Sequence, residues 1–187
     1  MVGFDNASGD RPIAVRAATM ADVPALQSLI ETSVRALSAP FYSQVQIEAS
    51  IREVFGVDTQ LIADGTYYVI DSSSGPTACG GWSHRRTLYG GDQMKDVVDP
   101  ELDPTVDAAR IRAFFVHPDF ARRGLARALY VEFAGAARAA GFRRIELMAT
   151  LPGEPLYLAL GFSPSERVSL PLGKGVELPL VRMARAL

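Results

Sequence analysis

Apolar residues recur at helical spacing in three parts of this chain. They fall every three or four positions over residues 23–37, 47–55 and 125–140, which is the period of an amphipathic helix. Gly141 follows the third stripe directly, as expected for the end of a helix. The run EPLYLAL at residues 154–160 predicts a short fourth helix.

Runs rich in aromatic and β-branched residues separate these helices and predict strands. The predicted strands cover residues 13–19, 66–71, 77–83, 111–116, 143–150, 168–172 and 176–184. The turn sequence SSSGP joins the second and third strands as an antiparallel hairpin. Gly80 and Gly81 inside the third strand indicate a bulge or a close approach by another group. The strand–helix–strand unit at residues 111–150 implies two parallel neighbouring strands.

The order of these elements predicts the fold class. Along the chain it is β α α β β β α β α β β, which is typical of an α+β domain with a mixed β-sheet flanked by helices. A chain of 187 residues without repeats or linkers is one domain, which we place at residues 12–187 after a flexible N-terminal tail at residues 1–11. Residues 84–107 follow no regular period and predict a long loop, either functional or a family-specific decoration.

Composition narrows the classes of function. The chain is 48% hydrophobic with a net charge of −2, so it is a folded protein without the basic field that nucleic acids need. We expect no membrane span, no secretory signal and a cytoplasmic location, because no apolar run is long enough for either segment. One cysteine, Cys79, and two histidines make a metal site unexpected. Cys79 lies in an apolar run and is interpreted as a small buried residue.

The stretch FARRGLARALY places three arginines around a glycine at the start of the long helix. Cations are unfavourable at a helix N-terminus, whereas its free N–H groups bind anions, phosphates above all. We therefore interpret Arg122, Arg123, Gly124 and Arg127 as a phosphate-binding turn. The alternative is a plain turn with solvated arginines. Neither a Walker loop nor a GxGxxG motif is present.

The same region resembles the GNAT-type N-acetyltransferases. The resemblance rests on FFVHPDFARRGLARALY and, further on, PLYLALGF, together with the order of the elements. The family signature Q/R-x-x-G-x-G/A aligns with residues 121–126, where Gly124 and Ala126 match and Ala121 departs from the pattern. The resemblance covers roughly residues 13–183. It implies an acyl-CoA N-acyltransferase fold, with acetyl-CoA as co-substrate and no metal.

Position by position, the resemblance implies how the coenzyme is held. The turn would bind the pyrophosphate through backbone N–H groups, and the preceding strand would pair with the pantetheine arm in a gap between the family's fourth and fifth strands. The implied coenzyme-binding residues are Phe114, Phe115, Val116, Arg122, Arg123, Gly124, Leu125, Ala126, Arg127 and Thr150. Thr150 stands where relatives often have Asn, so the usual contact of that Asn is in question here.

Acetyl transfer requires a neutral amine, donors for the thioester oxygen and a proton for the departing thiolate. Tyr157 matches the family's frequent general acid; the alternative is an aromatic residue packed under the coenzyme. His84, of the residue type that titrates nearest neutrality, and Asp107 are candidate bases. Glu101 and a water chain are alternatives. The resemblance places the donor to the thioester oxygen at a backbone N–H near Val116.

Two hypotheses of function follow. The first is an enzyme that moves an acetyl group from acetyl-CoA to a primary amine of a small molecule or peptide, with no nucleic-acid or membrane partner. Many relatives are dimers, so a homodimer is compatible with the resemblance. The second is a non-catalytic acyl-CoA-binding or sensor domain of the same fold. The sequence does not identify the acceptor amine.

Overall fold

The computed structural model describes residues 13–94 and 99–187, and the predicted tail at residues 1–11 lies outside them. The strands are β1 Arg16–Ala17, β2 Tyr67–Ser72, β3 Gly75–Ser83, β4 Ala109–Val116, β5 Arg144–Thr150, β6 Ser163–Leu172 and β7 Val176–Ala186. The α-helices are α1 Val23–Ser38, α2 Gln44–Glu53, α3 Thr59–Ala63, α4 Leu125–Ala139 and α5 Glu154–Ala159. Short 3-10 turns are η1 Met20–Asp22, η2 Asp92–Met94, η3 Pro118–Phe120 and η4 Gly173–Gly175.

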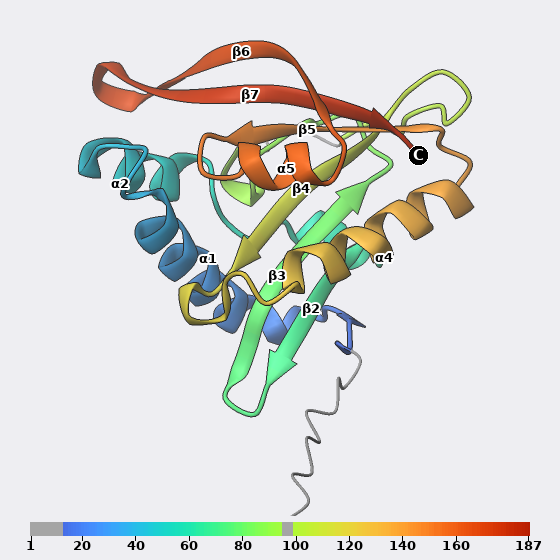
Figure 1. Cartoon of the computed structure of the whole chain (residues 1–187), viewed down its shortest axis with the longest axis horizontal. Helices are drawn as coiled ribbons and strands as arrows, with labels where there is room; N and C mark the ends of the chain where they lie inside the picture. The colour runs from blue at the N-terminus through green and yellow to red at the C-terminus, as the bar shows by residue number, and fades with distance from the viewer. Residues whose placement is uncertain (1–12, 95–98) are drawn as a thin grey trace, which may run out of the picture.

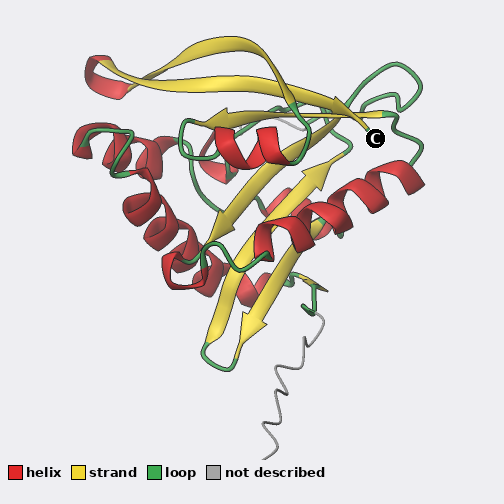
Figure 2. Ribbon diagram, viewed as in Figure 1, coloured by secondary structure: helices red, strands yellow, loops and turns green. Residues whose placement is uncertain are grey.

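One mixed sheet of seven strands organises the chain, in the order β1-β2-β3-β4-β5-β7-β6. β2 and β3 form the antiparallel hairpin that the SSSGP turn predicts, and β4 and β5 run parallel, as the strand–helix–strand unit predicts. β6 and β7 form a long hairpin along one edge of the molecule (Figure 2). The predicted α+β class and mixed sheet are confirmed.

Helices cover both faces of the sheet, so the molecule has two apolar cores. α4 and α5 pack on one face, where Leu129 and Phe133 are fully buried. α1 and α2 pack on the other, around Leu26, Ile30 and Ile47 (Figure 1). Most residues of the predicted α1 and α4 stripes are buried, because the 3.6-residue period places them on one side of each helix, but Leu37 and Ala140 are exposed. Within α2, only Ile47 of the predicted stripe is buried.

Gly80 and Gly81 lie where neighbouring atoms come too close to β3 to leave room for a side chain. An added Cβ at Gly80 would lie 2.5 Å from the carbonyl oxygen of Ala113, and one at Gly81 would lie 2.9 Å from a methyl carbon of Leu61. The register of β3 against β4 also shifts between Gly81 and Trp82. The sequence predicted a bulge or a close approach, and both are present.

Four features differ from the sequence-based expectation. β1 covers only Arg16–Ala17 of the strand expected at residues 13–19. α3 was not predicted, because five residues are too short to show a helical period; Asp58 caps it by accepting from the backbone N–H groups of Gln60 and Leu61. β6 begins at Ser163, earlier than expected, because it pairs with β7 through exposed polar residues that lack a strand-like apolar pattern. The described ends of the 84–107 loop pair with each other through the bridge between Arg85 and Glu101.

Candidate active site

β4 and β5 are paired only where they begin. Ala109, Arg110 and Ile111 pair with Ile145, Glu146 and Leu147, and the pairing ends there although β4 continues to Val116 and β5 to Thr150. β4 then stays with β3, while β5 stays with β7. The sheet therefore opens between its two central strands, which diverge in Figure 1. Backbone N–H and C=O groups on the facing edges are left without a strand partner.

A bulge marks the point of divergence. Gly81 pairs with Ala113 and Trp82 with Ile111, so Arg112 is an extra residue on the β4 side. A bulge bends its strand and increases the local twist, which turns the second half of β4 away from β5. The bulge and the loss of β4–β5 pairing fall at the same residue, and we interpret the bulge as a cause of the opening.

A cleft occupies this opening and passes between the two faces of the sheet. Its empty volume is about 1030 Å³, counting its open mouth. The lining comes from β4, β5, α1, α5 and the segments around residues 54–56 and 89–91. Most of these side chains are apolar or aromatic.

The turn that begins α4 follows β4 directly and is shaped for an anion. Gly124 has φ +83° and Arg122 has φ +64°, both in the left-handed region. Within the described chain, the backbone N–H groups of Gly124, Leu125 and Ala126 have no hydrogen-bond acceptor, and no side chain caps the helix. A Cβ at Gly124 would meet nothing within 4 Å. Free amides facing open space beside a left-handed turn form an anion site.

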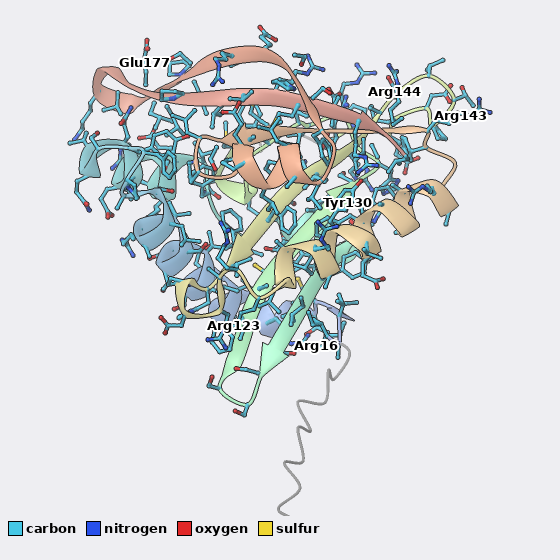
Figure 3. The ribbon with its side chains drawn as sticks, in the orientation of Figure 1. Arg16, Arg123, Tyr130, Arg143, Arg144 and Glu177 are labelled. Carbon is cyan, nitrogen blue, oxygen red and sulfur yellow. The ribbon has the colours of Figure 1, made fainter. Side chains whose placement is uncertain are left out.

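The three arginines of the turn are exposed and unpaired within the described chain. Arg122, Arg123 and Arg127 make no salt bridge to any described residue. The guanidinium of Arg123 lies 5.1 Å from the centre of the Phe120 ring, and Figure 3 places it at the start of α4. Their charges are thus available to a ligand. His117, just before, accepts a hydrogen bond from the N–H of Asp119 at 3.3 Å and has a structural role.

The predicted coenzyme-binding residues of β4 and β5 line the cleft. Phe114, Phe115, Val116 and Thr150 are all part of its wall. Phe115 faces the α1 core, whereas Phe114 and Val116 face the α4 core. Thr150 accepts a hydrogen bond from the N–H of Gly153 at 3.3 Å through its hydroxyl. Of the turn residues, Leu125 is buried in the core and Ala126 is half-buried, so their contribution to a ligand is limited to backbone N–H groups.

Tyr157 lies in the wall of the cleft, on α5. Its ring packs between Phe114 and Phe162, at 5.9 and 5.7 Å between ring centres. No hydrogen bond from its hydroxyl to a described residue is found, and burial alone perturbs its pKa. Burial raises the pKa of Tyr157 well above its usual value, so the hydroxyl stays protonated and can donate a hydrogen bond into the cleft.

The candidate bases lie outside the residues that line the cleft. Nε2 of His84 is 3.4 Å from Oδ2 of Asp64. Asp107 accepts from the backbone N–H of Asp103 at 2.9 Å and holds a turn. Glu101 is exposed at the bridge to Arg85. The structure therefore does not bring these groups together with Tyr157, and their role as bases stays a prediction.

The half of the cleft that α1 forms was not predicted from the sequence. Ser33, Val34 and Leu37 line it together with Phe55 and Tyr89. The α1 residues follow the apolar stripe that predicts core, and Tyr89 lies in the patternless loop, so no local signal separated them from ordinary packing.

Arg112 is the charged residue of the cleft wall, and the sequence did carry a signal for it. It interrupts the apolar run of residues 111–116, and its side chain is 1% exposed. Its guanidinium lies 2.9 Å from a carboxylate oxygen of Asp58 and 3.3 Å from one of Asp99, and it donates to the carbonyl oxygen of Gly90 at 2.7 Å. Burial lowers the pKa of Arg112, and the two carboxylates oppose that shift. This cluster ties the 84–107 loop to the sheet.

Neither a metal site nor a membrane helix is found in the parts of the chain that the structure describes. No group of three or more His, Cys, Asp or Glu side chains there could hold a metal ion. None of the described helices combines the length and apolar character required to cross a bilayer.

An open mixed sheet with an anion-binding helix start beside the opening is the architecture of an acyl-CoA N-acyltransferase. Residues 38–162 match the sequence model of the acetyltransferase (GNAT) family. The match covers more than half of the chain, which therefore belongs to the GNAT acetyltransferase family, as its resemblance predicted. A search of curated proteins found no significant match.

Solved structures support the same fold. A GCN5-related N-acetyltransferase from Rhodopseudomonas palustris is 18% identical, with a TM-score of 0.69 over 93% of this chain and 95% of that one. The PaiA N-acetyltransferase of Thermoplasma acidophilum, solved with coenzyme A, is 13% identical, with a TM-score of 0.64 over 93% and 98%. A phosphinothricin acetyltransferase of Sinorhizobium meliloti, solved with acetyl-CoA, is 18% identical, with a TM-score of 0.59 over 93% and 88%.

Proposed function

We propose that this protein is a cytoplasmic enzyme that transfers the acetyl group of acetyl-CoA to a primary amine of a small molecule or peptide. The observation that carries the proposal is the free amide turn at Gly124 next to an opening between β4 and β5. Membership of the GNAT family and neighbours solved with coenzyme A or acetyl-CoA support it.

Different segments of the chain bind the different parts of acetyl-CoA. Backbone N–H groups from Gly124 to Arg127 bind the pyrophosphate, and Arg122, Arg123 and Arg127 add charge. The free edge of β4 from Phe114 to Val116 accommodates the pantetheine arm by hydrogen bonding as a missing strand would. The thioester is thereby brought to the place where the sheet opens.

Acetyl transfer forms a C–N bond and breaks the C–S bond. The neutral amine attacks the thioester carbon, a backbone N–H of β4 stabilises the oxygen as it gains charge, and the amine gives up its proton to solvent. Tyr157 donates a hydrogen bond to the departing sulfur. Because its pKa is raised far above that of a thiol, a complete proton transfer from Tyr157 is uphill, and its contribution is correspondingly modest.

Two measurements test the proposal. Thermal unfolding with acetyl-CoA, coenzyme A or ADP at about 100 times the dissociation constant should raise Tm by roughly 5–10 °C. Release of free thiol from acetyl-CoA should then depend on an added primary amine. No shift with any of the three ligands would contradict the coenzyme assignment. A shift without amine-dependent thiol release would instead favour the non-catalytic acyl-CoA-binding or sensor domain.

A further inference from the structure

Arg112 presents its main chain to the cleft and keeps its side chain inside the protein. It is one of the lining residues and is half-buried as a whole, yet its side chain is only 1% exposed. The accessible part of Arg112 is therefore its backbone at the bulge of β4, while its guanidinium is enclosed. Enclosing a charged group is costly unless the group is paired, so this arrangement calls for a physical reason.

We propose that Arg112 is a positioning residue for acetyl transfer. Its guanidinium, held by Asp58, Asp99 and the carbonyl oxygen of Gly90, fixes the bulge and so sets where the exposed backbone of β4 meets the thioester. Arg112 acts through the strand, and its side chain does not touch the reacting atoms. This inference rests on the proposed function and adds a residue to the same site.

Beyond the bulge, β4 is held by one neighbouring strand instead of two. Its pairing with β5 ends at Ile111, and only β3 continues alongside it. A bulge also leaves its extra residue, here Arg112, outside the ladder of paired residues. The position of this backbone therefore depends on what holds the Arg112 side chain. The dependence matters for catalysis, because a displacement of about 1 Å at a reacting centre can lower a rate about 100-fold.

The guanidinium of Arg112 uses both terminal nitrogens. Nη2 lies 2.9 Å from Oδ2 of Asp58 and donates to the carbonyl oxygen of Gly90 at 2.7 Å, and Nη1 lies 3.3 Å from Oδ2 of Asp99. Each carboxylate is also held through its other oxygen. Oδ1 of Asp58 caps α3, and Oδ1 of Asp99 accepts from the N–H of Thr87 at 2.8 Å. The acceptors are thus themselves fixed in place, as precise positioning requires.

The segments that hold Arg112 continue into the wall of the cleft. Residues 54–56, just before Asp58, and residues 89–91 of the loop both line it. The two segments are joined to each other, since the N–H of Gly91 donates to the carbonyl oxygen of Val54 at 2.9 Å. The guanidinium therefore links the strand that is proposed to meet the thioester with another part of the same cavity.

Arg112→Lys tests the role of the guanidinium. Lysine keeps the positive charge beside the two carboxylates, but a single ammonium nitrogen on a flexible stem cannot reproduce the planar fork. The kcat for amine-dependent thiol release should fall about 10–100-fold. The dissociation constant of acetyl-CoA should stay within about threefold of that of the unmodified protein, because the turn at Gly124 carries the pyrophosphate binding.

Arg85→Lys is the matched control. Arg85 also anchors the 84–107 loop, through Asp64 and the carbonyl oxygen of Asp99, but it lies outside the residues that line the cleft. Both substitutions should lower Tm, because each weakens an ion pair that is largely shielded from water. Only Arg112→Lys should lower kcat, since Arg85 does not hold the bulge.

The bound thioester gives a readout that a loss of stability does not change. The C=O stretching frequency of acetyl-CoA with an isotope label at the carbonyl carbon reports the hydrogen bonds that the oxygen accepts. Infrared difference spectra of the bound coenzyme should show a higher frequency in Arg112→Lys than in the unmodified protein, because displaced backbone of β4 donates less well. Arg85→Lys should leave this frequency unchanged.

A second variant covers the case in which Arg112→Lys does not fold. Asp99→Asn keeps an oxygen that can accept from Thr87 but removes the charge that faces Arg112. It should lower kcat and raise the C=O frequency, each by less than Arg112→Lys does, because Asp58 and Gly90 still hold the guanidinium.

The outcomes separate this inference from the proposed function. An unchanged kcat or an unchanged C=O frequency in folded Arg112→Lys, or in Asp99→Asn where it takes its place, would overturn the positioning role and leave acetyl transfer standing. Equal losses of kcat in Arg112→Lys and Arg85→Lys would do the same, because they would reduce Arg112 to one stabilising contact among others. Absence of amine-dependent thiol release in the unmodified protein would overturn acetyl transfer and this inference together.

Discussion

At the scale of single residues, the turn before α4 combines two left-handed conformations. Gly124 adopts its positive φ at little cost, whereas Arg122 adopts φ +64° as a residue with a Cβ, which costs about 1–2 kcal/mol. Strained backbone of this kind persists at ligand sites where the local arrangement serves binding. Both residues lie within the turn that presents free N–H groups.

Gly124→Glu should lower the affinity for acetyl-CoA at least about 100-fold, because it adds bulk and negative charge where the pyrophosphate is proposed to lie. The added side chain has room within the protein, since a Cβ there meets nothing within 4 Å. Gly65→Glu is a matched control, with φ +70° and the same free space away from the cleft. Titration calorimetry measures the affinity; equal losses in both variants would place the pyrophosphate elsewhere.

Tyr157→Phe should lower kcat about 10–100-fold and leave the affinity for acetyl-CoA unchanged, because the ring packing remains and the hydrogen bond to the sulfur is lost. The pKa of Tyr157 is raised, so its hydroxyl is protonated throughout the neutral range. The ratio of the two kcat values should therefore be constant from pH 6 to 9. A kcat for the variant equal to that of the unmodified protein across this range would refute the acid role.

At the scale of elements, the end of β5 is held in place by Tyr42, which lies between α1 and α2. The hydroxyl of Tyr42 accepts from the N–H of Leu151, just past β5, at 2.9 Å. It also donates to the carbonyl oxygen of Pro179 in β7 at 2.7 Å. Burial raises the pKa of Tyr42 to about 12, so the hydroxyl keeps its proton and both bonds persist at neutral pH. This bridge holds the end of β5 where β5 has separated from β4.

Tyr42→Phe should lower the free energy of unfolding by about 1–3 kcal/mol, because it removes two part-buried hydrogen bonds at once. Denaturant unfolding measures this loss. Tyr130→Phe in α4 (Figure 3) is the matched control, because it removes the same hydroxyl group but should not lower the free energy of unfolding. The hydroxyl of Tyr130 is buried and has no hydrogen-bond partner among the described residues, so its removal should stabilise the protein or leave it unchanged. A loss of stability for Tyr130→Phe equal to that for Tyr42→Phe would contradict this difference.

At the scale of the whole molecule, the ion pair between Arg85 and Asp64 joins the segment after the β2–β3 hairpin to the segment before it. Arg85, at the start of the 84–107 loop, donates to both carboxylate oxygens of Asp64, which follows α3, at 2.7 and 2.8 Å. These hydrogen bonds hold the pKa of Asp64 below its usual value. Arg85 also donates to the carbonyl oxygen of Asp99, so the pair anchors the loop whose other residues form a wall of the cleft.

The lowered pKa of Asp64 predicts a dependence of stability on pH. A carboxyl whose pKa is lower in the folded state stabilises fully above its unfolded pKa of about 4 and loses that contribution as the pH falls through the folded pKa. Asp64→Asn should therefore cost about 1–2 kcal/mol at pH 7 and progressively less as the pH falls below 4. Urea unfolding at pH 3 to 7 measures it; a cost independent of pH would contradict the ion pair.

The sequence predicted most of the fold because that information is local. The stripes of α1, α2 and α4, the β2–β3 hairpin and the parallel β4–β5 pair follow from periods, turn residues and connection length. α3 was missed because its five residues lack a full period. The turn at Gly124, which we propose binds the coenzyme, was visible because a glycine and cations at a helix start are unusual in themselves.

What the sequence by itself determined is thus the order of the elements other than α3, the α+β class and the position of the glycine turn that begins α4, since each depends on residues close together along the chain. Only the tertiary structure decided where the sheet opens. The opening depends on the bulge at Arg112 and on the pairing of β4 with β3 and of β5 with β7. The tertiary structure also decided that Ser33, Leu37 and Tyr89 share one cavity, while His84 and Asp107 stay outside its lining. Contacts between residues distant in sequence are set by the packing of whole elements, and no local pattern encodes them.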